Sequence, residues 1–206
     1  DGVCRIPDLI ARVKDLGQTA VAVTDHGVMY GAVDFYKAAK AAGIKPIIGC
    51  EVYVARRTRF DKVHELDGES RHLVLLCENE EGYHNLIALV SKAWVEGFYN
   101  KPRVDLDLLR QHHQGLIALS ACLAGEIPRA LSRNDYEGAR EAALTYQEIF
   151  GPGNFFLELQ DHGLDEQKRI NPQLIRLSRE TGIPLVCTND CHYIAPQDSR
   201  MHHVLI

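Results

Sequence analysis

The 206-residue sequence contains no apolar run near the roughly 20 residues that a membrane-spanning helix needs, and no signal peptide opens it. Its six cysteines lack the close spacing of a disulfide framework or a zinc knuckle. An excess of basic charge is missing too: the formal net charge is −5, which argues against a domain that holds nucleic acid mainly by its own charge. These absences predict a protein of a reducing cytoplasm with no membrane partner.

What remains is the composition of an ordinary globular domain, with 46% hydrophobic and 25% charged residues. The length suits one core of good size, and no internal repeat or low-complexity tract divides the chain. The chain starts without methionine and stops in the apolar HHVLI. We therefore expect residues 1–206 to be one domain of a longer protein.

Short apolar runs alternate with stretches of helical periodicity. The runs predict six strand regions, at 19–27, 44–55, 71–79, 114–126 (with a loop at its end), 154–163 and 183–193. The periodic stretches predict helices at 30–43, 80–98, 136–151 and 164–182. Repeated strand–helix units with nearly continuous apolar strands predict an α/β protein, with an open doubly wound sheet and a closed barrel as alternatives.

The charged segment 57–70 has weak periodicity and predicts a loop or flap. Basic residues are concentrated at its start: Arg56, Arg57, Arg59 and Lys62. Contact with DNA and exposure to solvent are both compatible with this pattern. We favour a solvated flap.

Residues able to bind metal follow most of the predicted strands. They are Asp25 and His26 after the first, Glu51 in the second, Cys122 after the fourth, Glu158, Asp161 and His162 in the fifth, and Asp190 and His192 in the last. The carboxyl ends of the strands of an α/β barrel form one rim, so a shared site explains this pattern better than unrelated accidents. In an extended backbone, Asp190 and His192 would also point to the same side.

Each of these residues alone also has an ordinary structural explanation. Asp25 suits a turn, Cys122 suits a small buried side chain, and His162 suits the residue before a helix capped by Asp165. Taken together, imidazole, carboxylate and thiolate ligands favour zinc, manganese or iron over magnesium or calcium. A bridging carboxylate such as Glu51 could hold two ions about 3.5–4 Å apart, the separation used in two-metal phosphoesterases.

Six motifs occur in order along the chain: TDHG (24–27), KPIIGCEVYV (45–54), HLVLLCENEEGYHNLIALVSKA (72–93), LSACLAGEIPRAL (119–131), GPGNFFLELQDHG (151–163) and LVCTNDCHYIAPQDSRMHHVL (185–205). Together they resemble the amino-terminal PHP (polymerase and histidinol phosphatase) domain family of bacterial DNA polymerase III alpha subunits. The resemblance covers essentially the whole chain. TDHG alone is weak, but its combination with the other motifs is specific.

The resemblance implies a distorted (β/α)7 barrel whose rim binds two or three divalent metal ions, zinc or manganese foremost, with iron or magnesium as alternatives. The residues that match the family's metal ligands are Asp1, His26, Glu51, His72, Cys122, Asp190 and His192. The catalytic subset that we expect is His26, Glu51, Asp190 and His192. Asp161 and His162 are not ligands in the family, so with Glu158 they are expected near the site at most.

Two features depart from this simple pattern. His72 precedes its apolar run instead of following it, so it enters the ligand set by resemblance alone. In addition, the family's domain opens with a strand that carries a His-x-His pair shortly before Asp1, and that strand is absent from this sequence. We therefore expect the first strand of the barrel to be missing, and metal affinity and activity to be reduced with it.

Three functions are compatible with these residues. The first is a metal-dependent phosphoesterase, a 3′–5′ exonuclease that proofreads beside the polymerase site of the parent chain. The second is a structural and docking module that stabilises the polymerase and binds a separate proofreading subunit. The third, a phosphatase for a small monoester, is disfavoured because HLVLLCENEEGYHNL matches the polymerase branch. The first two imply DNA, held mainly by the rest of the polymerase, and the other holoenzyme subunits as partners in the bacterial cytoplasm.

Overall fold

The structure is a computed structural model that describes residues 2–205. Its strands are β1 (Ala20–Val23), β2 (Lys45–Ala55), β3 (Ser70–Cys77), β4 (Arg103–Val104), β5 (Leu116–Leu119), β6 (Phe155–Leu159) and β7 (Leu185–Cys187). Its helices are α1 (Ile6–Asp15), α2 (Ala32–Ala41), α3 (His64–Asp67), α4 (Glu80–Val95), α5 (Leu106–Gln111), α6 (Glu126–Ser132), α7 (Tyr136–Phe150), α8 (Asp165–Thr181) and α9 (Ser199–Leu205). None of the helices in this range is long and apolar enough to cross a membrane.

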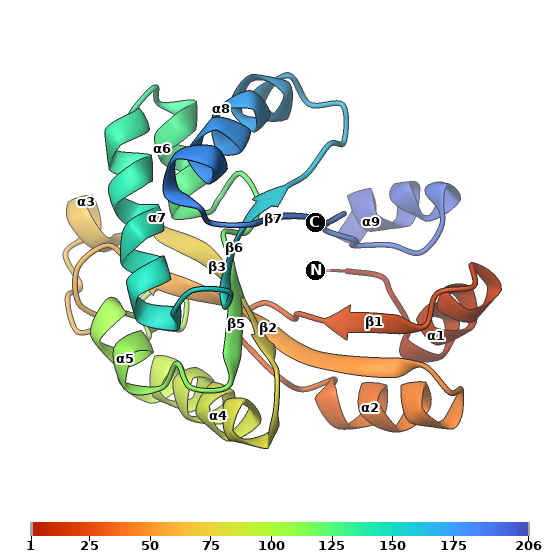
Figure 1. Cartoon of the computed structure of the whole chain (residues 1–206). Coiled ribbons are helices and arrows are strands. Elements are labelled where there is room, and N and C mark those ends of the chain that lie inside the picture. The colour runs from red at the N-terminus through yellow and green to blue at the C-terminus, as the bar shows by residue number, and fades with distance from the viewer. Residues whose placement is uncertain (1, 206) are drawn as a thin grey trace.

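The strands form one curled sheet in the order β1-β2-β3-β5-β6-β7, with β4 paired to β2 beside this path. Most neighbours are parallel, but β3 runs antiparallel to both β2 and β5. Within the described residues, β1 and β7 are the two ends of the path, and the N-terminal segment lies near the gap between them (Figure 1). The amide of Val3 donates to the carbonyl of His192 there (2.8 Å). The predicted distorted barrel is thus confirmed as a mixed α/β half-barrel.

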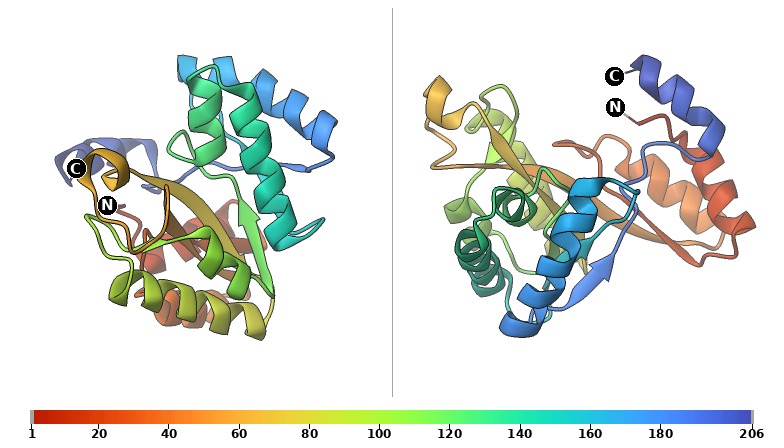
Figure 2. Two further views of the ribbon diagram at one scale, coloured as in Figure 1. Left: turned by 90° about the vertical axis from the view of Figure 1, so that its left-hand side faces the viewer. Right: turned by 90° about the horizontal axis from the view of Figure 1, so that it is seen from above.

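Helices cover the outer face of the sheet on one side of the molecule, and α1 and α2 flank β1 on the other (Figures 1 and 2). The main core lies between the sheet and α4 to α8 and includes fully buried Leu75, Leu86 and Phe155. A separate small core joins α1 and α2 to β1 and β2. A third cluster, built around Val74 and Leu119, lies on the opposite face of the sheet from the main core, because alternate side chains of a strand point to opposite faces.

All six predicted strand regions contain a strand, and the four predicted helices are present as α2, α4, α7 and α8. The strand predicted at 183–193 is wrong beyond Cys187, where the chain continues as loop. The two-residue β4 and the helices α1, α3, α5, α6 and α9 were not predicted. Each of these elements spans 10 residues or fewer, which leaves little periodicity for a sequence pattern to show.

Most residues of the segment before β3 are exposed, as predicted for a solvated flap, but two of its arginines pair with carboxylates. The Nε of Arg57 donates to Asp67 Oδ1 (3.0 Å), and Asp67 is buried. Arg59 donates to Glu96 (2.7 Å) and Asp105 (3.1 Å). The Arg57–Asp67 pair lies within the segment, and the two pairs of Arg59 fasten the segment to the C-terminal end of α4 and to the start of α5.

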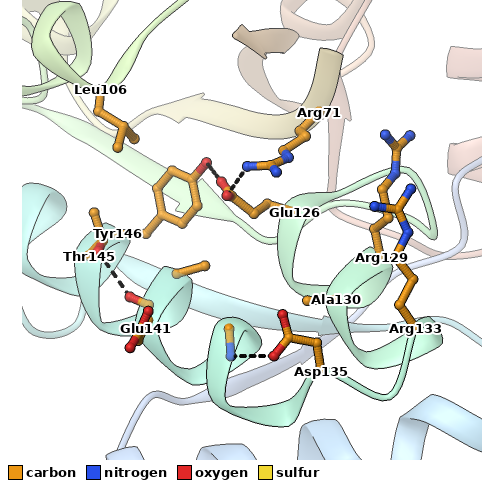
Figure 3. Close-up of a pocket in the computed structure, with 12 residues that line it drawn as sticks. Arg71, Leu106, Glu126, Arg129, Ala130, Arg133, Asp135, Glu141, Thr145 and Tyr146 are labelled. Carbon is orange, nitrogen blue, oxygen red and sulfur yellow. Dashed lines mark hydrogen bonds and ion pairs between the residues drawn. The ribbon is translucent and has the colours of Figure 1, made fainter. Parts of the chain in front are cut away.

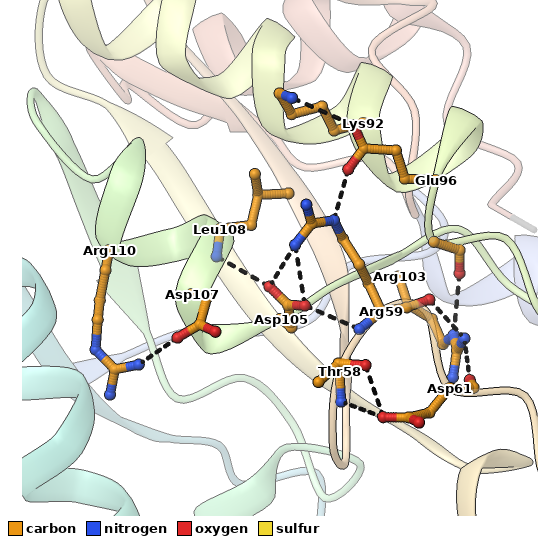
Figure 4. Close-up of polar contacts among 11 residues, drawn as sticks. Thr58, Arg59, Asp61, Lys92, Glu96, Arg103, Asp105, Asp107, Leu108 and Arg110 are labelled. Carbon is orange, nitrogen blue, oxygen red and sulfur yellow. Dashed lines mark hydrogen bonds and ion pairs between the residues drawn. The ribbon is translucent and has the colours of Figure 1, made fainter.

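Arg103 in β4 completes this attachment (Figure 4). Its side chain is only 1% exposed and donates to the backbone carbonyls of Gly97 (3.0 Å), Arg59 (3.0 Å) and Asp61 (2.8 Å). A guanidinium with several donors in a fixed plane can satisfy carbonyls from separate segments at once. One buried cation therefore joins the turn before β4 to the segment that follows β2.

Replacing Asp67 with Asn should lower the melting temperature by roughly 5 °C at pH 7, because Arg57 loses its ionised partner. The hydrogen bond from Arg57 lowers the pKa of Asp67 to about 2. An unfolded Asp titrates near pH 4, so this stabilisation is complete above about pH 4 and is lost as the pH falls through 2. Thermal unfolding of both proteins between pH 5 and 2 should show the difference shrinking.

The matched control is Asp107→Asn, which removes the exposed pair between Asp107 and Arg110 (3.0 Å). We expect little change in its melting temperature at any pH, since exposed pairs contribute little. An Asp67→Asn deficit that stays constant down to pH 2 would contradict the assignment.

Candidate metal centre

The turn after β1 places His26 directly beside Glu51. The parallel pairing of β1 and β2 is extended by a bridge between these two residues, in which Glu51 N donates to the Asp25 carbonyl (3.0 Å) and Gly27 N donates to the Glu51 carbonyl (2.9 Å). Gly27 has a φ of +66°, and a Cβ there would lie 2.9 Å from the Pro102 side chain. The predicted turn chemistry of TDHG therefore exists, and it also aims the imidazole at the carboxylate.

The register between β2 and β3 brings His72 to the same place. Tyr53 is paired with His72 and Glu51 with Val74, so these four side chains share one face of the sheet. His72 lies near the amino end of β3. Since β3 is antiparallel to both neighbours, this end lies at the same edge as the carboxyl ends of β2 and β5.

The three side chains converge on one space that suits a cation. His26 Nδ1 lies 3.3 Å from Glu51 Oε1, and His72 Nδ1 pairs with the same oxygen. One ligand atom from each of His26, Glu51 and His72 lies within 4.8 Å of the other two. Two imidazoles and a carboxylate are a ligand set typical of zinc and similar transition metals. The donor set and its spacing therefore fit a divalent ion.

Glu51 is the electrostatic centre of the cluster. It is 5% exposed, and burial alone would raise its pKa, but the side chains of His26 and His72 together lower the pKa to about 2. The hydrogen bond with Glu51 raises the pKa of His26, against the effect of burial. Glu51 is therefore ionised at neutral pH, which is the state that binds a metal.

Cys122 approaches the cluster from the loop after β5. Its Sγ lies 3.8 Å from His72 Nδ1. The preceding residue, Ala121, has a φ of +63°, a strained conformation that turns the loop toward the site. Burial raises the pKa of the Cys122 thiol to about 11, so an incoming metal would have to displace its proton.

Asp190 and His192 reach the same region, although not for the reason that the sequence indicated. Asp190 has a φ of +47°, so the backbone here is not extended and the alternation argument was wrong. A tight loop brings His192 Nδ1 to 2.9 Å from the Asp190 carbonyl and 3.8 Å from its carboxylate. The His192 ring centroid is 5.8 Å from that of His26, and the charge of Asp190 contributes to the raised pKa of His26.

The remaining candidates divide into three groups. Asp1 lies outside the described residues. Asp161 and His162 are exposed; His162 Nε2 contacts the Asn189 carbonyl (2.7 Å), which supports the loop that carries Asp190. Glu158 is buried and accepts hydrogen bonds from Thr188 and Gln160, so it joins β6 to the start of that loop.

Tyr53 is a component of the site that the sequence reasoning missed. Its ring lies 6.2 Å from the His26 ring, nearly parallel to it, and 5.2 Å from the His72 ring. The signal was available, because Tyr53 stands two residues after Glu51 on a strand and must share its face. The ring forms one wall of the cluster and limits how the two imidazoles can turn.

A separate cavity of about 380 Å³ lies beside α6 and α7 (Figure 3). Arg71 in its wall pairs with Glu126, which also accepts a hydrogen bond from the buried Tyr146 hydroxyl (2.9 Å). Because Arg71 immediately precedes His72 in β3, their side chains point to opposite faces of the sheet. This cavity is therefore not part of the metal centre.

Residues 1–162 match the family model described as "PHP domain", so the chain belongs to the PHP domain family. It is 50% identical over 207 residues to the DNA polymerase III subunit alpha of Treponema pallidum, and 47% identical over 210 residues to that of Thermus aquaticus. Each alignment covers 100% of this chain but only 18% and 17% of the relative.

Among solved structures, an amidohydrolase from Chromobacterium violaceum is similar, with a TM-score of 0.58 and 16% identity. The match covers 94% of this chain and 84% of that one. At this identity the likeness concerns the fold alone, and it agrees with the curled mixed sheet described above.

Adding Mn²⁺ or Zn²⁺ should raise the melting temperature by roughly 5–10 °C at about 100 times the dissociation constant. Glu51→Gln should remove more than half of this shift, because it removes the anionic ligand atom between the two imidazoles. Thermal unfolding with metal and with chelator measures both effects. Glu78→Gln, an exposed carboxylate just after β3, should keep the full shift. Equal shifts in the two variants would contradict a metal site at Glu51.

Proposed function

We propose that this PHP domain is a metal-dependent phosphoesterase that removes nucleotides from the 3′ end of DNA. The observation that carries the proposal is the convergence of His26, Glu51 and His72 within 4.8 Å, on three different segments of the chain. A phosphodiester is anionic and resists hydrolysis. Its cleavage needs an activated water and neutralisation of the phosphate charge, which metal ions held by imidazole and carboxylate ligands would supply.

The residues proposed to hold two or three divalent ions, zinc or manganese foremost, are Asp1, His26, Glu51, His72, Cys122, Asp190 and His192. Bound ions would supply an activated water and neutralise charge on the phosphate. Among the residues, buried Glu51 provides a carboxylate already ionised at neutral pH. Tyr53 and the Asp190 carbonyl restrict the orientations of His26 and His192, so that little reorganisation is needed. For catalysis we propose His26, Glu51, Asp190 and His192.

The wider assignment rests on the relatives. We propose that residues 1–206 form one domain of a longer replicative DNA polymerase chain, because the relatives of that name are more than five times as long as this chain. Polymerisation would then belong to the parent chain. DNA, held mainly by other parts of the polymerase, and the other polymerase III subunits would be its partners in the bacterial cytoplasm.

A structural and docking role is the second candidate. The proposed ligands come from β2, β3 and the loops after β1, β5 and β7, so bound ions would also tie these segments of an incompletely closed barrel together. On this reading, chelation destabilises the domain while no nucleotide is released by the purified protein. The same metals can fulfil both roles, so activity has to be measured directly.

Asp190→Asn should reduce metal-dependent release of nucleotides from single-stranded or mismatched 3′ ends by at least roughly a hundredfold. The side chain keeps its size but loses the charge that faces His26 and His192. Single-turnover assays on end-labelled DNA with the full-length protein measure the loss, and Asp161→Asn, an exposed neighbour, serves as control. An unchanged rate of nucleotide release by the Asp190→Asn protein would contradict the nuclease proposal.

A further inference from the structure

The C-terminal end of α4 carries an exposed aromatic pair next to the metal centre. Trp94 is the single tryptophan of the chain, and its Nε1 donates to the carbonyl of Gly27 (2.8 Å), the residue after His26. The rings of Trp94 and Phe98 are 5.4 Å apart with an interplanar angle of 23°. Trp94 is 43% exposed and Phe98 is 46% exposed. One edge of the indole is thus fixed to the site while much of both rings faces solvent.

Lys101 lies on the turn that follows this pair. Its Nζ is 5.3 Å from the centroid of the Tyr53 ring, the same ring that packs against His26 and His72. In the described part of the chain, no carboxylate lies within ion-pair distance of Lys101. A cation that no carboxylate of residues 2–205 neutralises therefore lies one aromatic ring from the proposed metal ligands.

The other cations of this region are committed to the protein (Figure 4). Arg59 pairs with Asp105 and Glu96, and Lys92 also pairs with Glu96 (3.3 Å). Buried Arg103 donates to the Gly97 carbonyl and fixes the start of the turn that carries Lys101. The position of Lys101 is therefore supported by neighbouring residues, while its charge remains available to a ligand.

We propose that Trp94, Phe98 and Lys101 bind the unpaired terminal nucleotide of a DNA strand, with its base against the two rings and a backbone phosphate at Lys101. This inference rests on the proposed function and names its substrate as single-stranded. Aromatic faces stack on any base, and a nearby cation follows the phosphate, which is how proteins hold single strands without reading sequence. A base that is paired in a duplex does not expose its face. The surface formed by Trp94, Phe98 and Lys101 should therefore select a frayed or mismatched end.

A protein partner would also cover exposed aromatic residues, but the position of this pair favours a nucleotide. Trp94 is hydrogen-bonded to the turn that presents His26, and Lys101 lies over the Tyr53 ring that packs against His26. A phosphate bound there would lie beside the proposed hydrolytic centre. A surface that serves only to bind a protein partner would not need these contacts between Trp94, Lys101 and the residues of the proposed metal centre.

The first test is photo-crosslinking of an oligonucleotide whose 3′-terminal base is 5-iodouracil to the full-length protein, in the presence of chelator. Mass spectrometry of the digested adduct should locate the crosslink within residues 94–98. Phe98→Ala should lower the yield at this peptide about tenfold, whereas Tyr36→Ala, an exposed aromatic residue on α2, should not. A crosslink that maps outside residues 94–98, or a yield that does not change in Phe98→Ala, would overturn the inference.

The second test compares cleavage of an intact 3′ terminus with that of a terminus lacking its base. The wild-type protein and Tyr36→Ala should prefer the intact terminus by about tenfold, and Phe98→Ala should lose this preference. Because crosslinking needs no metal, the two proposals fail separately. Crosslinking at 94–98 without any cleavage would support nucleotide binding by Trp94, Phe98 and Lys101 and reject the nuclease proposal. Cleavage with an unchanged preference in Phe98→Ala would support the nuclease proposal and reject this nucleotide-binding surface.

Discussion

The arrangement of this domain depends on the carboxylate of Glu51 lying between the imidazoles of His26 and His72. A carboxylate that is 5% exposed is tolerated only where positive or polar partners meet it, and here those partners come from two other segments of the chain. The bridge from His26 and the β2–β3 register that places His72 both bring an imidazole to this one group. The same requirement explains why the inner face of the sheet changes from apolar residues such as Val74 and Leu119 to polar ones at its rim.

Much of the half-barrel could be predicted from the sequence because its strands are almost continuous apolar runs. Most of the proposed ligands could also be predicted, since His26, Glu51 and Cys122 lie in or after such runs. His72 could not, because a sequence pattern does not reveal that β3 runs against its neighbours and so carries its amino end to the shared rim. Sequence pattern therefore pointed to candidates at strand ends, while His72, whose place depends on strand direction, was named by resemblance alone.

The prediction for Asp190 and His192 shows a different limit. The two residues do lie near His26, but the prediction assumed an extended backbone that the chain does not adopt, because Asp190 has a positive φ. The prediction of a solvated flap missed the pairing of Arg59 for a related reason. A charged run looks the same in sequence whether it faces water or, like Arg59, meets carboxylates that lie far along the chain. Long-range pairing of polar groups is the part of the structure that local pattern reveals least.

The length of the segment between β2 and β3 also determines which residue of β3 faces the carboxylate of Glu51. Opposite faces of β3 carry a guanidinium at Arg71 and an imidazole at His72, one position apart. Insertion of a single residue before β3, if the pairing slid by one, would turn Arg71 inward and His72 outward. Glu51 would then gain a permanent cationic neighbour in place of a group that can share it with a metal. The number of residues between β2 and β3 thus determines whether Glu51 belongs to a chelating pocket or to an internal salt bridge.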